Sequence, residues 1–142
     1  MMKKKIFLLG ILSAISIFSF ALTPPGVVLK AFRTKFPNAT NVKWEKESSH
    51  EYEASFMMHK AKYAANYSDK GKWLETETML TFAKVPSEVQ TAFTTGHPRE
   101  KVKAASKLEL AGGDVKYEIE VKKGAKTVEY FYTADGAVTV EK

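Results

Sequence analysis

The sequence predicts an α+β fold in which a helix followed by antiparallel strands occurs twice, with both helices packed on one face of a single antiparallel sheet. Residues 115–140 alternate apolar and polar side chains with a period of two and contain tight-turn residues, which is typical of a β-meander. The same pattern occurs earlier, over residues 50–74. The matched positions are Tyr52, Glu53, Phe56, Tyr67 and Gly71 in the first copy and Tyr117, Glu118, Val121, Tyr132 and Gly136 in the second.

Residues 1–21 are expected to be a cleaved signal peptide. Met1–Lys5 is basic, Ile6–Phe20 is apolar, and Ser19 and Ala21 are small residues at the positions that a signal peptidase reads. An uncleaved anchor is the alternative, but the apolar run is shorter than the roughly 20 residues that span a bilayer. The chain has no cysteine, so we expect neither a lipoprotein nor disulfide bonds. The predicted location is periplasmic or secreted.

The remaining chain, residues 22–142, is expected to be one domain. Removing Lys3, Lys4 and Lys5 with the signal peptide lowers the formal net charge from +6 to +3. This weak bias does not indicate nucleic-acid binding, which favours basic residues concentrated on one face. No further segment of the sequence is expected to span a membrane.

The first repeat is expected over about residues 27–82. Val28, Ala31, Phe32 and Phe36 form the apolar stripe of a short helix that ends at Pro37. Strands are predicted over 41–47, 51–58 and 61–67. A further strand candidate covers 73–82, and its facing stays open.

The second repeat is expected over about residues 85–140. Pro86 begins a helix with Val89, Ala92 and Phe93 on its apolar side, and Gly96 ends it. Each repeat is interpreted as one helix and three strands, with about four extra residues near 99–106 in the second. One continuous sheet is expected. The predicted core, buried together, is Phe32, Phe36, Phe93, Tyr52, Phe56, Tyr117, Ile119 and Val121.

No combination of residues indicates a catalytic, metal or cofactor site. The histidines are His50, His59 and His97, and they fall in two turns and at a helix end, whereas a metal site needs three or four convergent ligands. No serine has the glycine-flanked setting of a nucleophile elbow, and no glycine-rich loop precedes a helix. We therefore expect no catalytic residue, no metal ligand and no cofactor.

The sheet face away from the helices is predicted to be rich in charge. By strand parity it carries Glu45, Glu47, Glu51, Glu53, Glu109, Glu118, Glu120 and Glu129, with Lys43, Lys62, Lys107, Lys116 and Lys122 between them. A solvated lattice of cross-strand Glu/Lys pairs is one interpretation. A binding surface is the other, because apolar residues ringed by charge often mark an interface. The candidate protein-binding residues are Met57, Phe131, Glu118, Glu120 and Glu53.

Several structural motifs resemble those of the PepSY-like, β-lactamase-inhibitor-like family of small exported bacterial proteins. They are Phe32, Phe36-Pro37, Val42-Lys43-Trp44, Tyr52, Glu53, Phe56, Tyr67, Gly71-Lys72-Trp73, Pro86, Tyr117-Glu118 and Asp135-Gly136. The resemblance covers about residues 27–140 and implies a fold like that of the β-lactamase inhibitor protein. It carries no matched inhibitory residues. His97 departs from the aromatic residue that is usual before this proline.

The leading hypothesis is a non-catalytic binding module that engages a protein through the open sheet face. Two alternatives remain: an envelope stress or structural protein without a dedicated ligand, and a Glu-dependent hydrolase. The sheet side is expected to be acidic and the helix side basic, so a partner of the sheet should carry basic residues around an apolar centre. The basic residues assigned to the helix side are Lys30, Arg33, Lys35, Arg99, Lys101 and Lys103.

Overall fold

A computed structural model of the chain describes residues 22–140. The predicted signal peptide lies outside the described residues. The helices are α1 (Gly26–Lys35) and α2 (Ser87–Gly96), with a short 3-10 turn η1 (Phe82–Lys84) before α2. The strands are β1 (Thr40–Ser48), β2 (Glu51–Met58), β3 (Ala61–Ser68), β4 (Trp73–Leu80), β5 (Val102–Leu110), β6 (Val115–Lys123), β7 (Lys126–Tyr132) and β8 (Val138–Thr139).

All eight strands form one antiparallel sheet in the order of the chain, from β1 at one edge to β8 at the other. The predicted α+β class and continuous sheet are confirmed. Each half contains one helix and four strands, not the three strands per repeat that the sequence suggested, because residues 73–80 form a full strand and pair with β5. Within residues 22–140, neither helix has the length and apolarity needed to cross a membrane.

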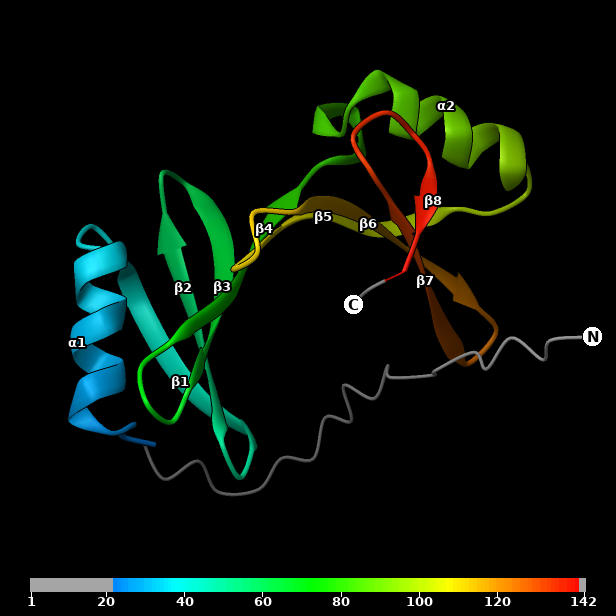
Figure 1. Cartoon of the computed structure of the whole chain (residues 1–142). Coiled ribbons are helices and arrows are strands. Elements are labelled where there is room, and N and C mark those ends of the chain that lie inside the picture. The colour runs from blue at the N-terminus through cyan, green and yellow to red at the C-terminus, as the bar shows by residue number, and fades with distance from the viewer. Residues whose placement is uncertain (1–21, 141–142) are drawn as a thin grey trace, which may run out of the picture.

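The sheet is curved, and both helices lie on its outer side (Figure 1). The cross-strand pairing shows that both helices lie on the same face of the sheet. Ala65, which packs in the core under α1, pairs with Thr76 on β4, and Thr76 pairs with Glu109 on β5. Side chains alternate along a strand, so Ala105 in the core under α2 points to the same side as Glu109. The opposite side of the sheet carries no helix and is called the helix-free face below.

The two helices begin and end in the same way. Pro25 and Pro86 stand at the N-caps, where a missing N–H costs nothing. At the other end, the backbone N–H of Phe36 donates to the Phe32 carbonyl oxygen at 2.8 Å, and that of His97 donates to Phe93 at 2.8 Å. The duplicated unit is therefore visible in matched hydrogen bonds as well as in matched elements.

The turn after the third strand of each half is also the same. In the first half, Gly71 N–H donates to the Ser68 carbonyl and Ser68 N–H to that of Lys72, each at 2.9 Å. In the second half, Gly136 donates to Thr133, and Thr133 to Ala137, at the same distances. Both glycines have positive φ, a conformation that glycine adopts without a steric cost.

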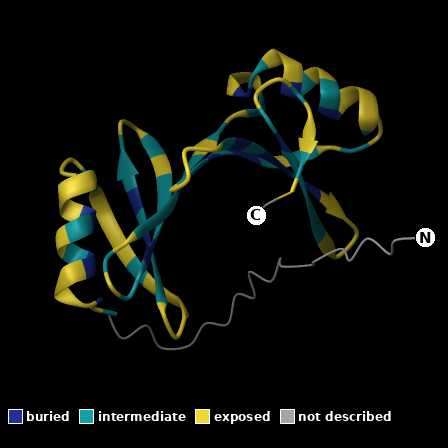
Figure 2. Cartoon of the chain, viewed as in Figure 1, coloured by how far each residue is buried: buried dark blue, intermediate teal, exposed yellow. Residues whose placement is uncertain are grey.

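The core is divided in two, and the prediction of one shared core is wrong. One cluster under α1 contains Phe32, Phe36 and Phe56, and the other under α2 contains Phe93, Ile119 and Val121. Tyr52 and Tyr117 are only partly buried and line the edges of these clusters. Exposed turns of both helices face outward, and buried residues lie on the strands and on the sides of the helices that face the sheet (Figure 2). Each helix covers its own half of the sheet, so no helix covers the β4–β5 junction.

The four additional residues of the second half lie in the β5–β6 connection, and the prediction that placed them near residues 99–106 is wrong. Trp44 pairs with Ala54 in the first half, and Ala105 pairs with Ile119 in the second. Trp44 and Ala105 are equivalent positions, and the same number of residues separates them as separates the two helices. Ala54 and Ile119 are also equivalent, but four more residues separate them. The longer hairpin extends β5 and β6 past the edge of α2.

Candidate binding face

The structure places all five predicted binding residues on the helix-free face. Met57 and Glu53 come from β2, Glu118 and Glu120 from β6, and Phe131 from β7. They form two groups, because β3, β4 and β5 separate β2 from β6. Glu118 lies directly opposite Phe131 across the β6–β7 ladder. The five residues therefore share one face without forming one compact site.

The structure corrects the predicted facing of two charged residues on β5. Lys107 and Glu109 pair with Thr78 and Thr76, and they lie on the helix side. The core position of Ala105 under α2 fixes the parity of the strand, so Leu108 and Leu110 point to the helix-free face instead. Alternation alone would have turned these leucines toward the helices.

Two glutamates that the sequence could not orient also lie on the helix-free face. Glu75 and Glu77 on β4 pair with Leu110 and Leu108 on β5. They fill the centre of the face, between the acidic residues of β2 and those of β6. The acidic strip thus has glutamates on five strands, β1, β2, β4, β6 and β7. Its glutamates are Glu45, Glu51, Glu53, Glu75, Glu77, Glu118, Glu120 and Glu129.

Two cross-strand pairs on this face unite like charges. Glu45 lies directly opposite Glu53, and Glu120 lies directly opposite Glu129. Like charges directly opposite destabilise a sheet. In the register of the described strands, no glutamate of the strip lies directly opposite a lysine. Lysines contact these glutamates from diagonal positions instead, as Lys103 on β5 contacts Glu120 on β6 at 2.8 Å.

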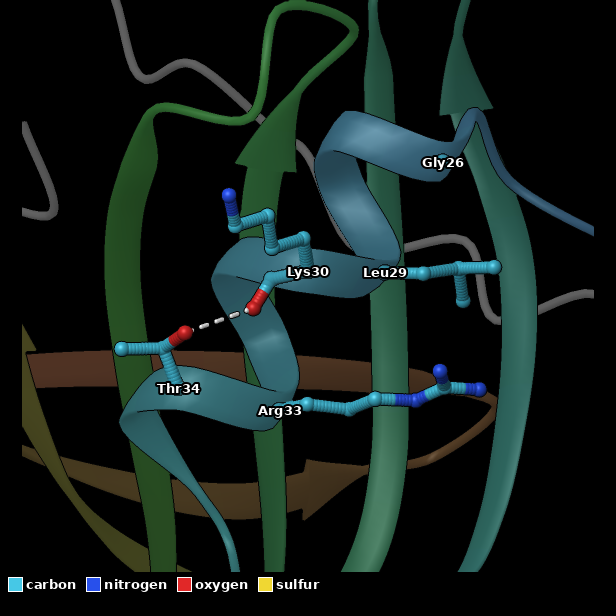
Figure 3. Close-up of a pocket in the computed structure, with 5 residues that line it drawn as sticks. All are labelled: Gly26, Leu29, Lys30, Arg33 and Thr34. Atoms are coloured by element: carbon cyan, nitrogen blue, oxygen red, sulfur yellow. Dashed lines mark hydrogen bonds between the residues drawn. The ribbon is translucent and has the colours of Figure 1, made fainter.

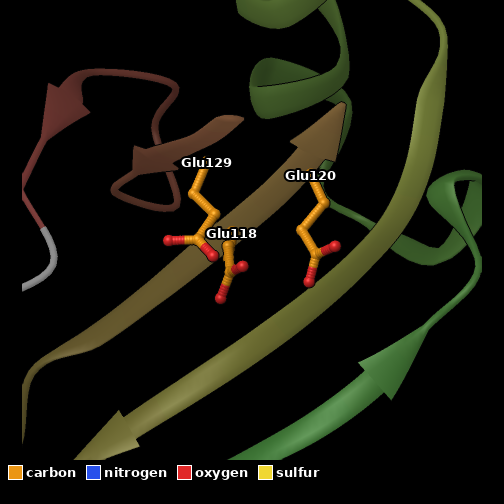
Figure 4. A group of neighbouring side chains, drawn as sticks. All are labelled: Glu118, Glu120 and Glu129. Atoms are coloured by element: carbon orange, nitrogen blue, oxygen red, sulfur yellow. The ribbon is translucent and has the colours of Figure 1, made fainter. Parts of the chain in front are cut away.

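Three carboxylates come together on β6 and β7. Oxygen atoms of Glu118, Glu120 and Glu129 all lie within 4.8 Å of one another (Figure 4). Lys103 contacts this group, with its Nζ 2.8 Å from Glu120 Oε2, and the hydroxyl of Ser106 donates to Glu118 at 3.5 Å. Glu118 is 9% exposed. The group concentrates negative charge at one end of the helix-free face.

Burial and neighbouring carboxylates raise the pKa of two glutamates in the acidic strip, Glu53 and Glu77. Burial, assisted by the nearby Glu47 carboxylate, raises the pKa of Glu53 to about 7. Burial also raises the pKa of Glu77, with further increases from Glu120 and Glu75. The repulsion along the strip is thus relieved in part by protonation near neutral pH. A cation bound at the helix-free face would also reduce the repulsion between these carboxylates.

Apolar side chains interrupt the acidic strip. Met57 and Phe131 are partly buried and reach the helix-free face from β2 and β7. Met79 shares this face through its pairing with Ser106, and it is 39% exposed. Strand parity failed to identify Met79 because the facing of β4 was open. The face therefore combines apolar contacts with an excess of negative charge.

The outer side of α1 is basic. Lys30, Arg33 and Lys35 are exposed, and a shallow hollow there is lined by Gly26, Leu29, Lys30, Arg33 and Thr34 (Figure 3). The Thr34 hydroxyl donates a hydrogen bond to the Lys30 carbonyl oxygen within α1. The prediction for Lys103 is wrong, because its ammonium lies on the helix-free face beside Glu120. The separation of charge between the two sides is otherwise as expected for α1.

Two of the three histidines, His50 and His97, contact neighbouring protein groups. His50 lies 2.9 Å from Asp69 in a pair of adjacent turns. His97 ends α2 and packs 3.9 Å from the ring of Tyr130, with Glu100 at 3.4 Å. His50 and His97 belong to opposite halves of the chain, and each is held by a local partner.

The comparisons with known proteins follow this geometry. A sequence profile of the family described as "Putative beta-lactamase-inhibitor-like, PepSY-like" matches residues 50–139. The chain belongs to this family. No curated protein matches the sequence. Among solved structures, a BLIP-like protein from Bacteroides fragilis is 27% identical, with a TM-score of 0.74, over 85% of this chain and 86% of that one.

Two other solved structures have the same fold. A DUF2874 family protein from Bacteroides ovatus is 26% identical, with a TM-score of 0.75, over 82% of this chain and 85% of that one. A "putative periplasmic" protein from Bacteroides eggerthii is 21% identical, with a TM-score of 0.76, over 82% of this chain and 86% of that one. The latter similarity supports the fold alone. The BLIP-like neighbour confirms the predicted architecture.

Proposed function

We propose that this PepSY-like protein is a non-catalytic binding module that engages a basic protein partner through its helix-free face. The observation that carries the proposal is the pair of like-charged contacts, Glu45 with Glu53 and Glu120 with Glu129. The first pair costs the isolated fold free energy, and the second shares one nearby lysine, Lys103, so lysines or arginines of a partner would meet an excess of carboxylates at both places.

The apolar residues of the face suggest how such a partner makes contact. Met57, Met79 and Phe131 lie on three different strands of the helix-free face, among the acidic side chains. Apolar contacts supply most of the affinity of an interface, and complementary charge steers and orients the encounter. The partner is therefore expected to carry an apolar group flanked by basic residues.

The family supports a binding role over a catalytic one. Its description is inhibitor-like, and a solved relative is BLIP-like. A Glu-dependent hydrolase would need a carboxylate acid and base around a bound substrate. Turnover of a peptide, β-lactam or glycan that is lost in Glu118→Gln and Glu120→Gln would establish that alternative.

The proposed location is the periplasm or the exterior of the cell. The expected signal peptide over residues 1–21 supports export. The partner would then be an envelope protein. A structural or stress role without a dedicated partner is the competing proposal, and partner contact separates the two.

Site-specific photo-crosslinking tests the proposal. A photoreactive phenylalanine analogue is placed at Met57 or Phe131 on the helix-free face, and at Leu29 or Thr91 on the helices as matched controls. We expect one discrete adduct from both sheet positions in cells and none from the helices. Adducts from the helix positions alone would contradict the proposed face. No adduct from any position would favour the structural role.

A further inference from the structure

A second groove lies on the opposite side of the sheet, at the β4–β5 junction that neither helix covers. It is an open groove with a volume of about 410 Å³. Its lining residues are Lys35, Phe36, Met58, Tyr63, Trp73, Thr76, Thr78, Lys107 and Glu109. The groove is separate from the helix-free face, so the inference below does not rest on the proposed protein binding.

The two sides of the groove differ in chemistry. Aromatic and apolar side chains come from the first half of the chain, with Tyr63 and Trp73 as the largest. Hydroxyl groups come from Thr76 and Thr78 on β4, and charged groups from Lys35 on α1 and from β5, where Lys107 Nζ lies 3.2 Å from Glu109 Oε1. A ligand of this groove must therefore have an apolar surface and a row of hydrogen-bonding groups.

The aromatic groups are held in fixed orientations. The Tyr63 ring stacks on the buried Phe56 ring at 5.4 Å and an interplanar angle of 16°. The indole N–H of Trp73 donates to the Thr76 hydroxyl at 2.9 Å, and Lys35 Nζ lies 3.8 Å from the centre of a Trp73 ring. Groups that are already ordered lose little entropy when a ligand binds.

The second half of the chain shows that the fold does not require these aromatic residues. Tyr63 pairs with Phe56 as Val128 pairs with Val121, and Trp73 pairs with Tyr67 as Val138 pairs with Tyr132.

Valines therefore occupy both equivalent positions, and Val138 is 79% exposed. The repeated unit forms with aromatic residues at these two positions in the first half and with valines in the second. Tyr63 and Trp73 pack against the cluster under α1 and also line the groove, so the aromatic lining is a feature of the first half alone.

From this arrangement we propose that the groove binds a neutral oligosaccharide. A pyranose ring presents an apolar C–H face, which suits the face of the Tyr63 ring that Phe56 does not cover, and a rim of hydroxyl groups. Lys35 and Lys107 offer N–H donors to those hydroxyls, and Glu109 accepts from them. Lys107 is paired with Glu109, and Lys35 lies over the Trp73 ring, so both ammonium groups of the lining are already engaged. This arrangement favours a neutral ligand over an anionic one.

Tryptophan fluorescence tests this proposal directly. The chain has two tryptophans, so Trp44→Phe leaves Trp73 as the single reporter. The protein is titrated with cellohexaose, laminarihexaose and N-acetylchitohexaose. We expect at least one to give a saturable change with a half-saturation of about 1 mM or tighter. In amide NMR spectra the shifts should map to β4 and β5.

Two variants test whether the saccharide binds in the groove. Tyr63→Val installs the residue of the second half, and Glu109→Ala removes a partly exposed acceptor with little risk to folding. Each should weaken binding at least about threefold, whereas Glu53→Gln on the helix-free face should leave it unchanged.

The proposal is overturned if no saccharide changes the signal at 10 mM, or if the shifts map elsewhere. Binding of an apolar dye without any saccharide would mark the groove as an apolar surface only, and would also overturn it.

Discussion

Gly136 lies directly against the backbone of Glu88 in α2, and a Cβ atom added at Gly136 would stand 2.7 Å from the Glu88 carbonyl oxygen. The first half has the same relationship, where Gly71 would place a Cβ atom 2.9 Å from the carbonyl oxygen of Val27. Each turn glycine therefore fixes the first turn of a helix against its own half of the sheet.

Gly136→Ala should destabilise the protein through both its positive φ and this close approach. Gly113 provides the matched control, since its φ is also positive but no atom lies within 4 Å of the added Cβ. Gly113→Ala should lose about 1 kcal/mol of unfolding free energy, and Gly136→Ala should lose about 1 to 2 kcal/mol more. Equal losses in denaturant melts would show that the contact with α2 carries no weight.

Phe32→Ala and Phe93→Ala should each lower the free energy of unfolding by about 3 to 5 kcal/mol, because each leaves a cavity in a packed cluster. The two clusters have no residue in common. In the double variant the losses should therefore add to within about 0.5 kcal/mol. A single loss below about 1 kcal/mol would mean that the helix does not dock as described.

Tyr67→Phe should leave stability unchanged or increase it by about 1 kcal/mol, an outcome that is unusual for a fully buried residue. The Tyr67 hydroxyl is buried and has no hydrogen-bond partner among the described residues, and burial raises its pKa. Removing the hydroxyl removes that desolvation cost. Tyr67→Ala, which also removes the ring, should instead be strongly destabilising. A large loss in Tyr67→Phe would contradict this account of the hydroxyl.

Glu53 should make stability depend on pH. Its pKa is raised from 4.5 to about 7 in the folded protein, so its stabilising protonation is complete below about pH 4.5 and is lost as the pH rises through 7. Allowing for solvent screening, Glu53→Gln should gain about 1 kcal/mol at pH 8 and nothing at pH 4.5. Glu88→Gln is the control, because hydrogen bonds lower the pKa of Glu88. An equal gain at both pH values would reject the assignment.

The sequence predicted the repeated architecture because its strongest signals are local. The helix stripe of Phe32 and Phe36, the alternation of β6 and the turn glycines each depend on a few neighbouring residues. The class of fold, the continuous sheet and the helix positions follow from them. The division into two cores was not predicted, because it depends on how far each helix extends over the curved sheet.

The facing of β4 and β5 could not be read from these local patterns. Leu108 and Leu110 alternate with Lys107 and Glu109, so parity alone turns the leucines toward the helices. The structure reverses them because Ala105 must lie beneath α2 while the end of β5 runs into the junction that no helix covers. As a result, the sequence missed Glu75 and Glu77 in the acidic strip and the groove on the other side.

The central claim is that a basic partner binds the helix-free face, and charge reversal measured against partner binding tests it most directly. Glu118→Lys with Glu120→Lys is compared with Lys30→Glu and Arg33→Glu on α1, and Glu53→Gln with Glu120→Gln serves as a milder pair that guards against misfolding. Affinity for the crosslinked partner is measured at low and high salt. The account predicts that both sheet-side pairs weaken binding at least about tenfold, that salt reduces the affinity of the wild type, and that the α1 pair has little effect. Loss of binding in the α1 pair, with both sheet-side pairs intact, would contradict it.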